Sequence, residues 1–512
     1  MTLWSNRPTN TFVDVQPGGS GNAWAIFDRD GGINGPSGGG QPVESRWGRG
    51  DNGGFEPRGT VVTGNPERFT GQLSTRLKYE EFLLTLQQTN CFYNLRVRQI
   101  CDDPYQLTNY KAAIVYPESF TTSRSYSDNL ANATEDNEAD LMDQYDFSAI
   151  TESRYLKCRH DDIKKTWSDF AFNRVRNVST IRCGGGDCGI PQQGNENYVA
   201  VTDVDNTPGY AGNPAPNLYY TTDRGVNWSS VAIPLFPNGN ATDVVKAGGL
   251  ILVACPTFGV AYARYQDILD QVPNPNVWTL SSGFSAPNGP NALSVVDGSL
   301  VIAVGNNGRI WQSTDGGLTF TLIDSTTTAV TLNAVSFASE NLAWIGGNSG
   351  VLLRVSIANG VVATIAIVPV RTTAGVTLSS NILTVQAPSN RVNEVYVGTA
   401  GGQVWRSRAA TNSRVFFETL SFVLSGNGQI NDIQFAGYKG EVMFVIQTNA
   451  ASNSRVLRDL SGGAMGNDVE VIGDFTSPAN NKMNSIATAN VNEAVTVGEV
   501  VNSYGWIGKV AA

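Results

Sequence analysis

Histidine is almost absent from this chain, with one residue, His160, among 512. Cysteine is also scarce, at six residues. Charged residues make up only 16% of the sequence, and no stretch approaches the roughly 18 consecutive apolar residues of a membrane-spanning helix. These absences argue against membrane insertion, and they exclude catalysis by a Ser-His or Cys-His pair in the second half of the chain.

The few cysteines have two interpretations. Free thiols are the ordinary state in a long chain that begins without a basic and apolar leader, here MTLWSNRPTN. The alternative is a Cys3His zinc site, whose ligand types are available in Cys158, His160, Cys183 and Cys188. Their spacing matches no zinc motif, so we expect free thiols, no metal and no cofactor in a soluble protein made in a cytoplasm.

The composition indicates a mainly β protein with an acidic surface. The formal net charge is −10, which disfavours a surface made to bind nucleic acid or anionic lipid. It is compatible with a surface past which DNA slides without adhering. A hydrophobic content of 41% with 54 glycines suits packed cores joined by many turns, and a chain of this length predicts two or three domains.

The second half of the chain is repetitive. From about residue 175 onward, a unit of four short apolar strands recurs with a period of roughly 40 to 50 residues, which is typical of β-propeller blades. We therefore predict a propeller over 166–512 with seven blades, although six or eight fit the pattern. One glycine position recurs in the unit, at Gly305, Gly347, Gly398 and Gly498. First strands are expected near Val178, Val244, Leu293, Leu332, Ile382, Ile430 and Met483.

The last unit supplies only three strands. A propeller ring requires a fourth strand at that place, because an open sheet edge is exposed to pairing with other chains. The stretch TWSDFAF, residues 166–172, alternates apolar and polar side chains ahead of the first blade. We predict that it closes the ring by pairing with the strand around Ser503 to Val510.

Two short stretches share the pattern Ser/Thr-x-Asp-x-Gly-x-Thr/Asn-aromatic. The first contains Ser313, Asp315, Gly317, Thr319 and Phe320, and the second contains Thr221, Asp223, Gly225, Asn227 and Trp228. The pattern resembles the Asp-box of sialidase-like β-propellers. The resemblance implies a structural role, in which the box closes the hairpin between the third and fourth strands of a blade. Its carboxylate and hydroxyl groups bond the turn backbone, its glycine takes positive φ and its aromatic residue packs beneath.

The resemblance does not extend to catalysis. A sialidase-like site requires an arginine cluster, a tyrosine nucleophile with a glutamate partner and an acidic proton donor. The Arg-Ile-Pro motif that usually precedes the first box is missing, and no GxSxG, phosphate-loop, HExxH or EF-hand pattern occurs. We therefore predict no catalytic residues. Trp311, Trp344 and Trp405 could serve as sugar platforms, but their place in the repeat favours core packing.

The first 165 residues differ from the rest of the chain in composition and show no repeat. Residues 1–64 are rich in glycine and proline, which predicts an extended arm and loops without regular elements. Residues 65–165 predict a small β domain of strands with one short helix, whose buried face contains Phe82, Leu83 and Leu86. The acidic run EDNEADLMDQYD, residues 135–146, is expected to be a solvated face rather than a cation site.

This order of arm, strand, short helix and further strands looks like the tube-forming domain of tailed-phage major tail proteins. In that family a small β-sandwich with a flanking helix assembles into hexameric rings, and loops join stacked rings. The resemblance implies a virion tail-tube subunit that self-assembles in the host cytoplasm, contacts other virion proteins and lets DNA pass without specific binding. The propeller would lie outside, as decoration or in contact with the host surface.

Two other functions fit the same sequence. The propeller could be the receptor- or glycan-binding head of a fibre or spike, with residues 1–165 as its attachment. A sialidase-like glycoside hydrolase is the less favoured alternative, since the catalytic pattern is missing. Asp-boxes also occur in the propellers of photosystem II assembly factors, but these normally carry a signal peptide and lack such an N-terminal domain.

Overall fold

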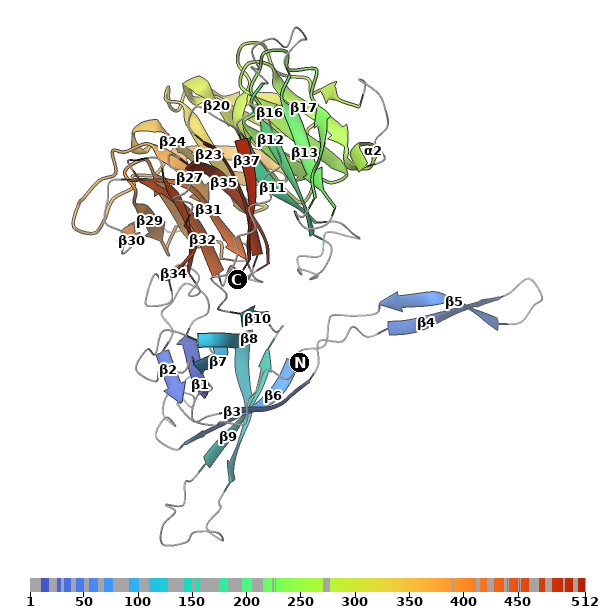
Figure 1. The fold of residues 1–512 in the computed structure, drawn as a ribbon, viewed down its shortest axis with the longest axis vertical. Helices are drawn as coiled ribbons and strands as arrows, with labels where there is room; N and C mark the ends of the chain where they lie inside the picture. Colours follow the sequence, from blue (N-terminus) through green and yellow to red (C-terminus); the bar gives the residue numbers. More distant parts are fainter. Residues whose placement is uncertain are drawn as a thin grey trace. The chain divides into compact units, whose positions relative to one another are not determined.

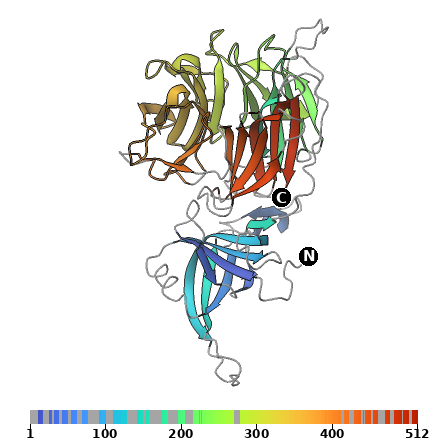
Figure 2. The same ribbon diagram turned by 60° about the vertical axis from the view of Figure 1, so that its left-hand side comes forward.

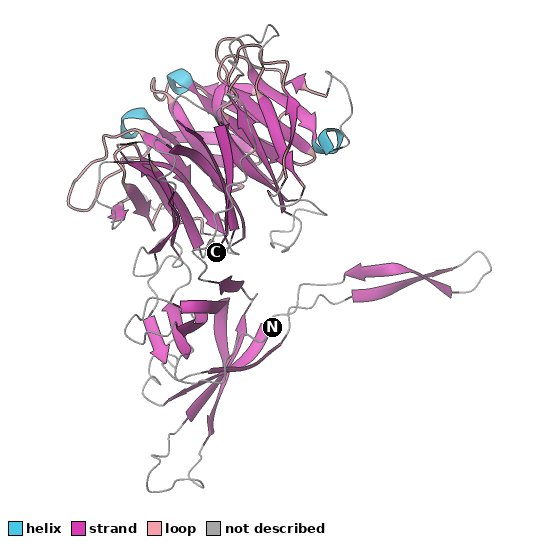
Figure 3. Cartoon of the chain, in the orientation of Figure 1, coloured by secondary structure: helices cyan, strands magenta, loops and turns pink. Residues whose placement is uncertain are grey.

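The computed structural model divides the chain into two compact units, Met1–Cys158 and Arg159–Ala512. Strands dominate both units (Figure 3). In the first unit the structure describes residues 11–17, 25–28, 32–37, 43–49, 55–62, 69–76, 92–100, 110–127, 142–149 and 153–156. In the second it describes 175–182, 196–204, 215–222, 225, 227–269, 277–388, 391–410, 415–420, 428–436, 440, 442–449, 451, 453–459, 469–474, 481–490, 493–500 and 505–511.

The first unit is built on one continuous eight-stranded sheet (Figures 1 and 2). Its order is β2 (Ala25–Asp28), β1 (Thr11–Pro17), β7 (Tyr93–Ile100), β8 (Tyr110–Ser127), β9 (Met142–Ala149), β6 (Phe69–Arg76) and β3 (Gly32–Ser37), with β10 (Ser153–Leu156) beside β8. The long strand β8 joins the two halves of the sheet. Its first part pairs with β7 and β10, and from Phe120 onward it pairs with β9.

The core of this unit lies on strands β1, β7, β8 and β9. The rings of Tyr116 and Phe147 meet edge to face at 5.3 Å, and Asn94 Nδ2 donates a buried hydrogen bond to Gln16 Oε1 at 2.8 Å. Asp146, from the acidic run, lies in β9 and accepts hydrogen bonds from Gln72 Nε2 and Ser123 Oγ. This half-buried carboxylate therefore takes part in the polar contacts between neighbouring strands of the sheet.

Residues 17–64 contain regular strands, so the prediction of an arm and loops without regular elements is wrong. Strands β2 and β3 belong to the large sheet, and β4 (Val43–Arg49) pairs with β5 (Phe55–Val62) in a separate two-stranded sheet. Glycine weakens a strand without abolishing it, and a backbone ladder needs no side-chain alternation. The predicted domain limit at residue 64 therefore falls inside one unit. The predicted helix with Phe82, Leu83 and Leu86 lies outside the described residues.

The second unit contains seven antiparallel sheets, six with four described strands and one with three. The first three are β11 (Val175–Arg182), β12 (Glu196–Thr202), β13 (Asn217–Thr221), β14 (Ser229–Ala232); β15 (Asp243–Ala247), β16 (Leu250–Cys255), β17 (Gly259–Arg264), β18 (Thr279–Leu280); and β19 (Pro290–Val296), β20 (Leu300–Gly305), β21 (Ile310–Ser313), β22 (Thr321–Asp324). A short helix, α2 (Tyr265–Leu269), follows β17.

The other four sheets follow in chain order. They are β23 (Leu332–Ser339), β24 (Leu342–Gly347), β25 (Leu352–Ala358), β26 (Val361–Ile367); β27 (Ile382–Gln386), β28 (Val395–Thr399), β29 (Val404–Ser407), β30 (Glu418–Leu420); β31 (Gly428–Ala436), β32 (Val442–Asn449), β33 (Ser454–Asp459), β34 (Val469–Asp474); and β35 (Asn481–Asn490), β36 (Glu493–Val500), β37 (Gly505–Ala511). All seven predicted first-strand centres lie in the first strand of a sheet. The regular period of the repeat made this prediction reliable.

The first six sheets pack face to face through apolar clusters. The seventh sheet contacts the sixth and packs against the first. Val175 and Val178 of β11 share a buried cluster with Ala487, Val495 and Ile507 from β35, β36 and β37. Burial of this kind is what a four-stranded sheet needs, since it cannot cover both faces alone. Trp311, Trp344 and Trp405 are at most 3% exposed, so the prediction that they are core residues is confirmed.

The recurring glycines do not all occupy one position. Gly305, Gly347 and Gly498 each pair with the residue just before a bulge in the first strand of their sheet. Gly398 instead pairs with Thr384, beyond the bulge, at the register of Gly346 in the fourth sheet. The prediction of one shared position is therefore wrong for Gly398, because a bulge shifts register in a way that spacing along the sequence does not reveal.

Candidate functional site

The predicted Asp-box residues of the third sheet lie in the turn between β21 and β22. Asp315 Oδ1 accepts hydrogen bonds from Ser313 Oγ (2.7 Å) and Thr319 N (2.9 Å), and Oδ2 accepts one from Thr319 Oγ1 (2.6 Å). Ser313 Oγ in turn accepts a bond from Gly317 N at 2.9 Å. Partial burial would raise the pKa of Asp315, but the bonds from Thr319 and Ser313 outweigh it and hold that pKa below its usual value.

The same turn is wedged against the second sheet. Ser281 Oγ donates to Gly317 O at 2.6 Å, and Phe320 N donates to Ser282 O at 2.9 Å. Gly317 has φ +93°, and a Cβ added there would lie 2.5 Å from Leu252 Cδ1 on β16. Glycine is therefore required both by the left-handed backbone and by close approach to the neighbouring sheet.

The second box has the same relation to its neighbour. Gly225 N donates to Thr221 Oγ1 at 3.0 Å between β13 and β14, and Trp228 Nε1 donates to Gly225 O at 3.3 Å. A Cβ on Gly225 would lie 3.2 Å from Val495 Cγ2 on β36. Asn227 is among the described residues, whereas Asp223 lies outside them. Each box turn thus packs on the second strand of another sheet, and for the first sheet that neighbour is the seventh.

Replacing Asp315 by alanine is expected to lower the free energy of unfolding of the second unit by about 1 kcal/mol, because three hydrogen bonds to a largely exposed carboxylate are lost. The folded-state pKa lies below the unfolded one. The carboxylate's contribution is therefore present above pH about 4 and lost as the pH falls further. Urea unfolding of wild type and Asp315→Ala at pH 7 and pH 3 tests this. An equal difference at both pH values would contradict it.

The first strands carry a recurring asparagine that the sequence analysis missed. Asn291, Asn333, Asn431 and Asn484 each lie at the bulge of their strand. The Nδ2 groups donate to carbonyl oxygens on the next sheet, at Leu332 (3.0 Å), Ile382 (2.8 Å), Met483 and Val175 (2.9 Å) respectively. The last of these bonds joins the seventh sheet to the first. The four-residue strings PNAL, LNAV, INDI and MNSI were the available signal.

The first strands of all seven sheets surround a central cavity of about 480 Å³. Two carboxylates lie on its wall and each bridges two sheets. Asp243 accepts hydrogen bonds from Val244 N (2.8 Å) and Leu293 N (2.6 Å). Asp432 accepts bonds from Ile433 N (2.8 Å) and Ile486 N (3.0 Å). Burial raises the pKa of Asp243 to about 7 and that of Asp432 to about 6, despite these bonds.

From the raised pKa values of these two carboxylates we predict that the second unit loses stability as the pH rises. Their folded-state pKa values, about 7 and about 6, lie above the unfolded value of about 4. The folded state therefore binds more protons, and the stabilisation present below pH 4 is lost as the pH rises through 6 to 7. We expect the free energy of unfolding to fall by a few kcal/mol, in order of magnitude, between pH 5 and pH 8, with a weaker fall in Asp243→Asn. Urea titrations across this range measure it, and parallel curves for the two proteins would contradict it.

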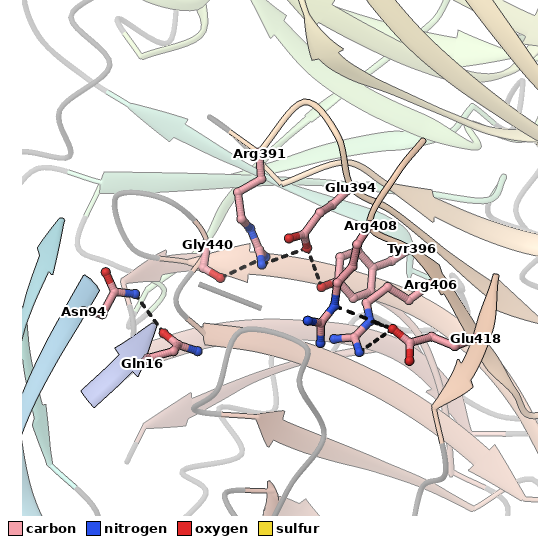
Figure 4. Close-up of polar contacts among 9 residues, drawn as sticks. All are labelled: Gln16, Asn94, Arg391, Glu394, Tyr396, Arg406, Arg408, Glu418 and Gly440. Carbon is pink, nitrogen blue, oxygen red and sulfur yellow. Dashed lines mark hydrogen bonds and ion pairs between the residues drawn. The ribbon is translucent and has the colours of Figure 1, made fainter. Parts of the chain in front are cut away.

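Three guanidinium and two carboxylate groups gather around Tyr396 (Figure 4). Arg391 Nη1 and the Tyr396 hydroxyl both donate to Glu394 Oε2, at 3.0 and 2.9 Å. The remaining contacts are Arg391 Nη2 to Gly440 O at 3.1 Å, Arg406 Nη2 to Glu418 Oε1 at 2.6 Å, and Arg408 Nε to the same carboxylate oxygen at 3.6 Å.

No protein-family model and no curated protein matches the sequence. Among solved structures, YCF48 from Cyanidioschyzon merolae is similar at 12% identity and TM-score 0.45, over 67% of this chain and 96% of that one. YCF48 bound to D1 peptide is similar at 10% identity and TM-score 0.43, over 67% of this chain and 93% of that one. The β-propeller domain of Cps50 (Swd1) from Myceliophteria thermophila is similar at 12% identity and TM-score 0.42, over 65% of this chain and 99% of that one. The strand order and the packing of the seventh sheet on the first decide the fold. The second unit is a β-propeller.

The cluster around Tyr396 contains the residue types that a sialidase-like site requires, and no sequence motif pointed to it. Tyr396 is fully buried in the propeller, with its ring 4.9 Å from that of Phe435 on the next sheet. Burial raises the pKa of this tyrosine to about 12, and the Arg391 guanidinium lies over the Phe435 ring at 5.1 Å. A nucleophile must reach solvent and substrate. We therefore interpret this cluster as an ion-pair network within the fifth sheet, which contacts the sixth sheet through Arg391 and Tyr396.

Metal-ligand groups and membrane-spanning helices are both absent among the described residues. These residues contain no group of three or more metal-ligating side chains, and none of their helices has the length and apolar character needed to cross a membrane. Cys255 is a free, buried thiol. The four residues of the alternative zinc site, Cys158, His160, Cys183 and Cys188, lie outside the described part of the chain.

Proposed function

We propose that this protein is a virion structural subunit, a phage tail-tube protein that polymerises through residues 1–158 and displays the β-propeller outside. The hairpin β4–β5 is the observation that carries this proposal. It pairs with no other strand of the described chain, and a lone two-stranded hairpin is marginally stable at best in water. Such a hairpin requires another surface, which a neighbouring copy supplies.

The edges of the large sheet support the same proposal. Its described strand order ends at β2 on one side and at β3 on the other. Exposed edges favour pairing with another chain. Because the hairpin is inserted between β3 and β6 in the sequence, it belongs to the β3 side. Contact between this side and the β2 side of the next copy is heterologous, and such contacts close into rings when the rotation allows.

The composition agrees with this assignment. A formal net charge of −10 suits a lumen through which DNA passes without specific binding. The proposed partners are further copies of the chain, other virion proteins and, through the propeller, the host surface. We propose assembly in the host cytoplasm and no catalytic residue, metal or cofactor.

For the propeller we propose seven blades, one for each sheet, with the Asp-box residues as structural elements. Six sheets have four described strands, whereas β35–β37 has three. We infer that residues 166–172, which precede β11 in the sequence, supply the missing fourth strand; they lie outside the described residues. The alternative of a glycan-binding head loses its best candidates, since Trp311, Trp344 and Trp405 are buried.

Negative-stain electron microscopy of the full-length protein at rising concentration tests the proposal. We expect stacked rings or tubes with additional density on the outside. Monodisperse monomers or trimers over the whole concentration range would contradict the tail-tube assignment and would favour a fibre head.

A further inference from the structure

The outer strand of the fourth sheet, β26, differs from the other described outer strands of the propeller. It has seven residues, VVATIAI, and carries no charge. Strands β14, β18, β22 and β30 have at most four residues, and β34 contains two carboxylates. Val361 and Ile367 of β26 are 53% and 54% exposed. Proteins normally protect a sheet edge by shortness or charge, and β26 has neither protection.

Among the described residues, only the start of this edge has hydrogen-bond partners outside its own sheet. Gln312 of β21 donates through Nε2 to Gly360 O at 2.7 Å and accepts at Oε1 from Val362 N at 3.0 Å. The side-chain amide of Gln312 thus makes the two hydrogen bonds that one residue of a paired strand would make. Farther along, Val368 N donates inward to Leu352 O at 2.8 Å. Alternation in an antiparallel ladder then directs the N–H and C=O groups of Ile365 and Ile367 outward.

An exposed aromatic and cationic patch continues from the end of β26. Val376 and Phe416 are 58% and 40% exposed, and the Arg371 guanidinium lies 5.8 Å from the centre of the Phe416 ring. Phe417 N donates to Arg371 O at 2.9 Å, which holds the fifth sheet's segment against this turn. No ion pair involving Arg371 is present among the described residues. Exposed aromatic and arginine side chains of this kind are enriched at protein interfaces.

We propose that β26 together with Arg371, Val376 and Phe416, here named the rim site, binds an extended segment of a partner protein by strand addition. The segment is uncharged and aliphatic where it pairs with Ile365 and Ile367, and it carries a carboxylate that reaches Arg371. Backbone hydrogen bonds supply affinity in this mode of recognition, and side-chain contacts supply selectivity. Charge decides against a second copy as the occupant. Two β26 strands paired with each other bring no carboxylate to Arg371, and the whole chain is already acidic at −10.

The test uses full-length protein and a synthetic peptide, acetylated and amidated, of sequence Glu-Val-Thr-Val-Thr-Val-Thr with a fluorophore. The leading glutamate lies near Arg371 when the peptide pairs antiparallel to β26. We expect saturable binding by fluorescence anisotropy and slower hydrogen exchange at the amides of Ile365 and Ile367. Ile367→Lys should weaken binding about tenfold or more. Leu322→Lys is the matched control, since Leu322 is 47% exposed on the outer strand β22, and it should leave binding unchanged.

A second peptide with glutamine in place of glutamate isolates the charge. Arg371→Glu should weaken binding of the glutamate peptide about fivefold or more and leave binding of the glutamine peptide nearly unchanged. Lack of saturable binding up to about 1 mM, or equal binding by wild type and Ile367→Lys, overturns the proposal. Sedimentation velocity without peptide tests whether a second copy of the chain binds this edge. A dimer that Ile367→Lys abolishes would assign the edge to a second copy and would also overturn the proposal.

Discussion

Removal of the hairpin β4–β5 is expected to abolish assembly and leave the propeller folded. Strands β3 and β6 pair antiparallel with Ser37 opposite Thr70, so residues 43–62 can be replaced by a short Gly-Ser linker without separating these strands. The hairpin is the one described two-stranded sheet of the chain and is marginally stable on its own, so in the proposed assembly contact with a neighbouring copy stabilises it. We expect no rings or tubes at concentrations where the wild type forms them, as seen by negative stain and sedimentation.

A point variant and a control make this experiment specific. Ser45 lies opposite Thr60 in the hairpin, and proline at Thr60 removes the backbone N–H there and disturbs the ladder while the chain length is kept. It should impair assembly in the same direction. Asp315→Ala weakens the propeller and should assemble normally. Normal tubes from the chain without its hairpin would refute the assembly role, whatever the propeller does.

Gly283→Ala should destabilise the propeller more than any other single change considered above. Gly283 has φ +100°, and an added Cβ would lie 1.7 Å from Phe320 O. Relief requires the chain to move away from the Asp-box turn, which breaks the bond from Phe320 N to Ser282 O and opens the contact between the second and third sheets. We expect the free energy of unfolding to fall by about 3–5 kcal/mol, a range typical of backbone strain combined with lost packing.

Gly360→Ala is the matched control for this substitution. Gly360 also has positive φ, at +71°, but no atom lies within 4 Å of an added Cβ. It should cost about 1 kcal/mol, since only the left-handed backbone is penalised. Urea unfolding followed by tryptophan fluorescence measures both variants. Similar losses in the two proteins would show that the contact with Phe320 is not what makes Gly283 necessary.

Local patterns predicted much of the propeller. Second strands buried on both faces, such as β20, produce strong apolar runs at a regular period. They located the preceding first strands around Val178, Leu293 and Ile430. Each Asp-box is a contact within about eight residues, and its turn geometry follows from the side chains of that turn. Trp311 was assigned to the core because its place in the repeat points toward a neighbouring sheet.

Contacts between sheets were beyond such patterns. The bond from Asn484 to Val175 joins residues 309 positions apart, and the asparagine is at a bulge whose position depends on strand register. The contacts of Arg391 with Gly440 O and with the Phe435 ring likewise depend on which sheet is adjacent. In the first unit, glycine-rich strands lack the side-chain alternation that marks a strand, and hydrogen bonding to neighbours decided their structure.

The amino-acid sequence by itself determined the class of the fold, the repeat and the turns, because these depend on hydrophobic periodicity and on side chains bonding their own backbone. Only the tertiary structure decided that Asp243 and Asp432 bridge sheets around a central cavity, that Tyr396 is inaccessible, and that β26 is left as an open edge. Each of these properties depends on what lies beside a residue in space. A pKa, an exposed fraction and a free sheet edge are set by neighbours from distant parts of the chain.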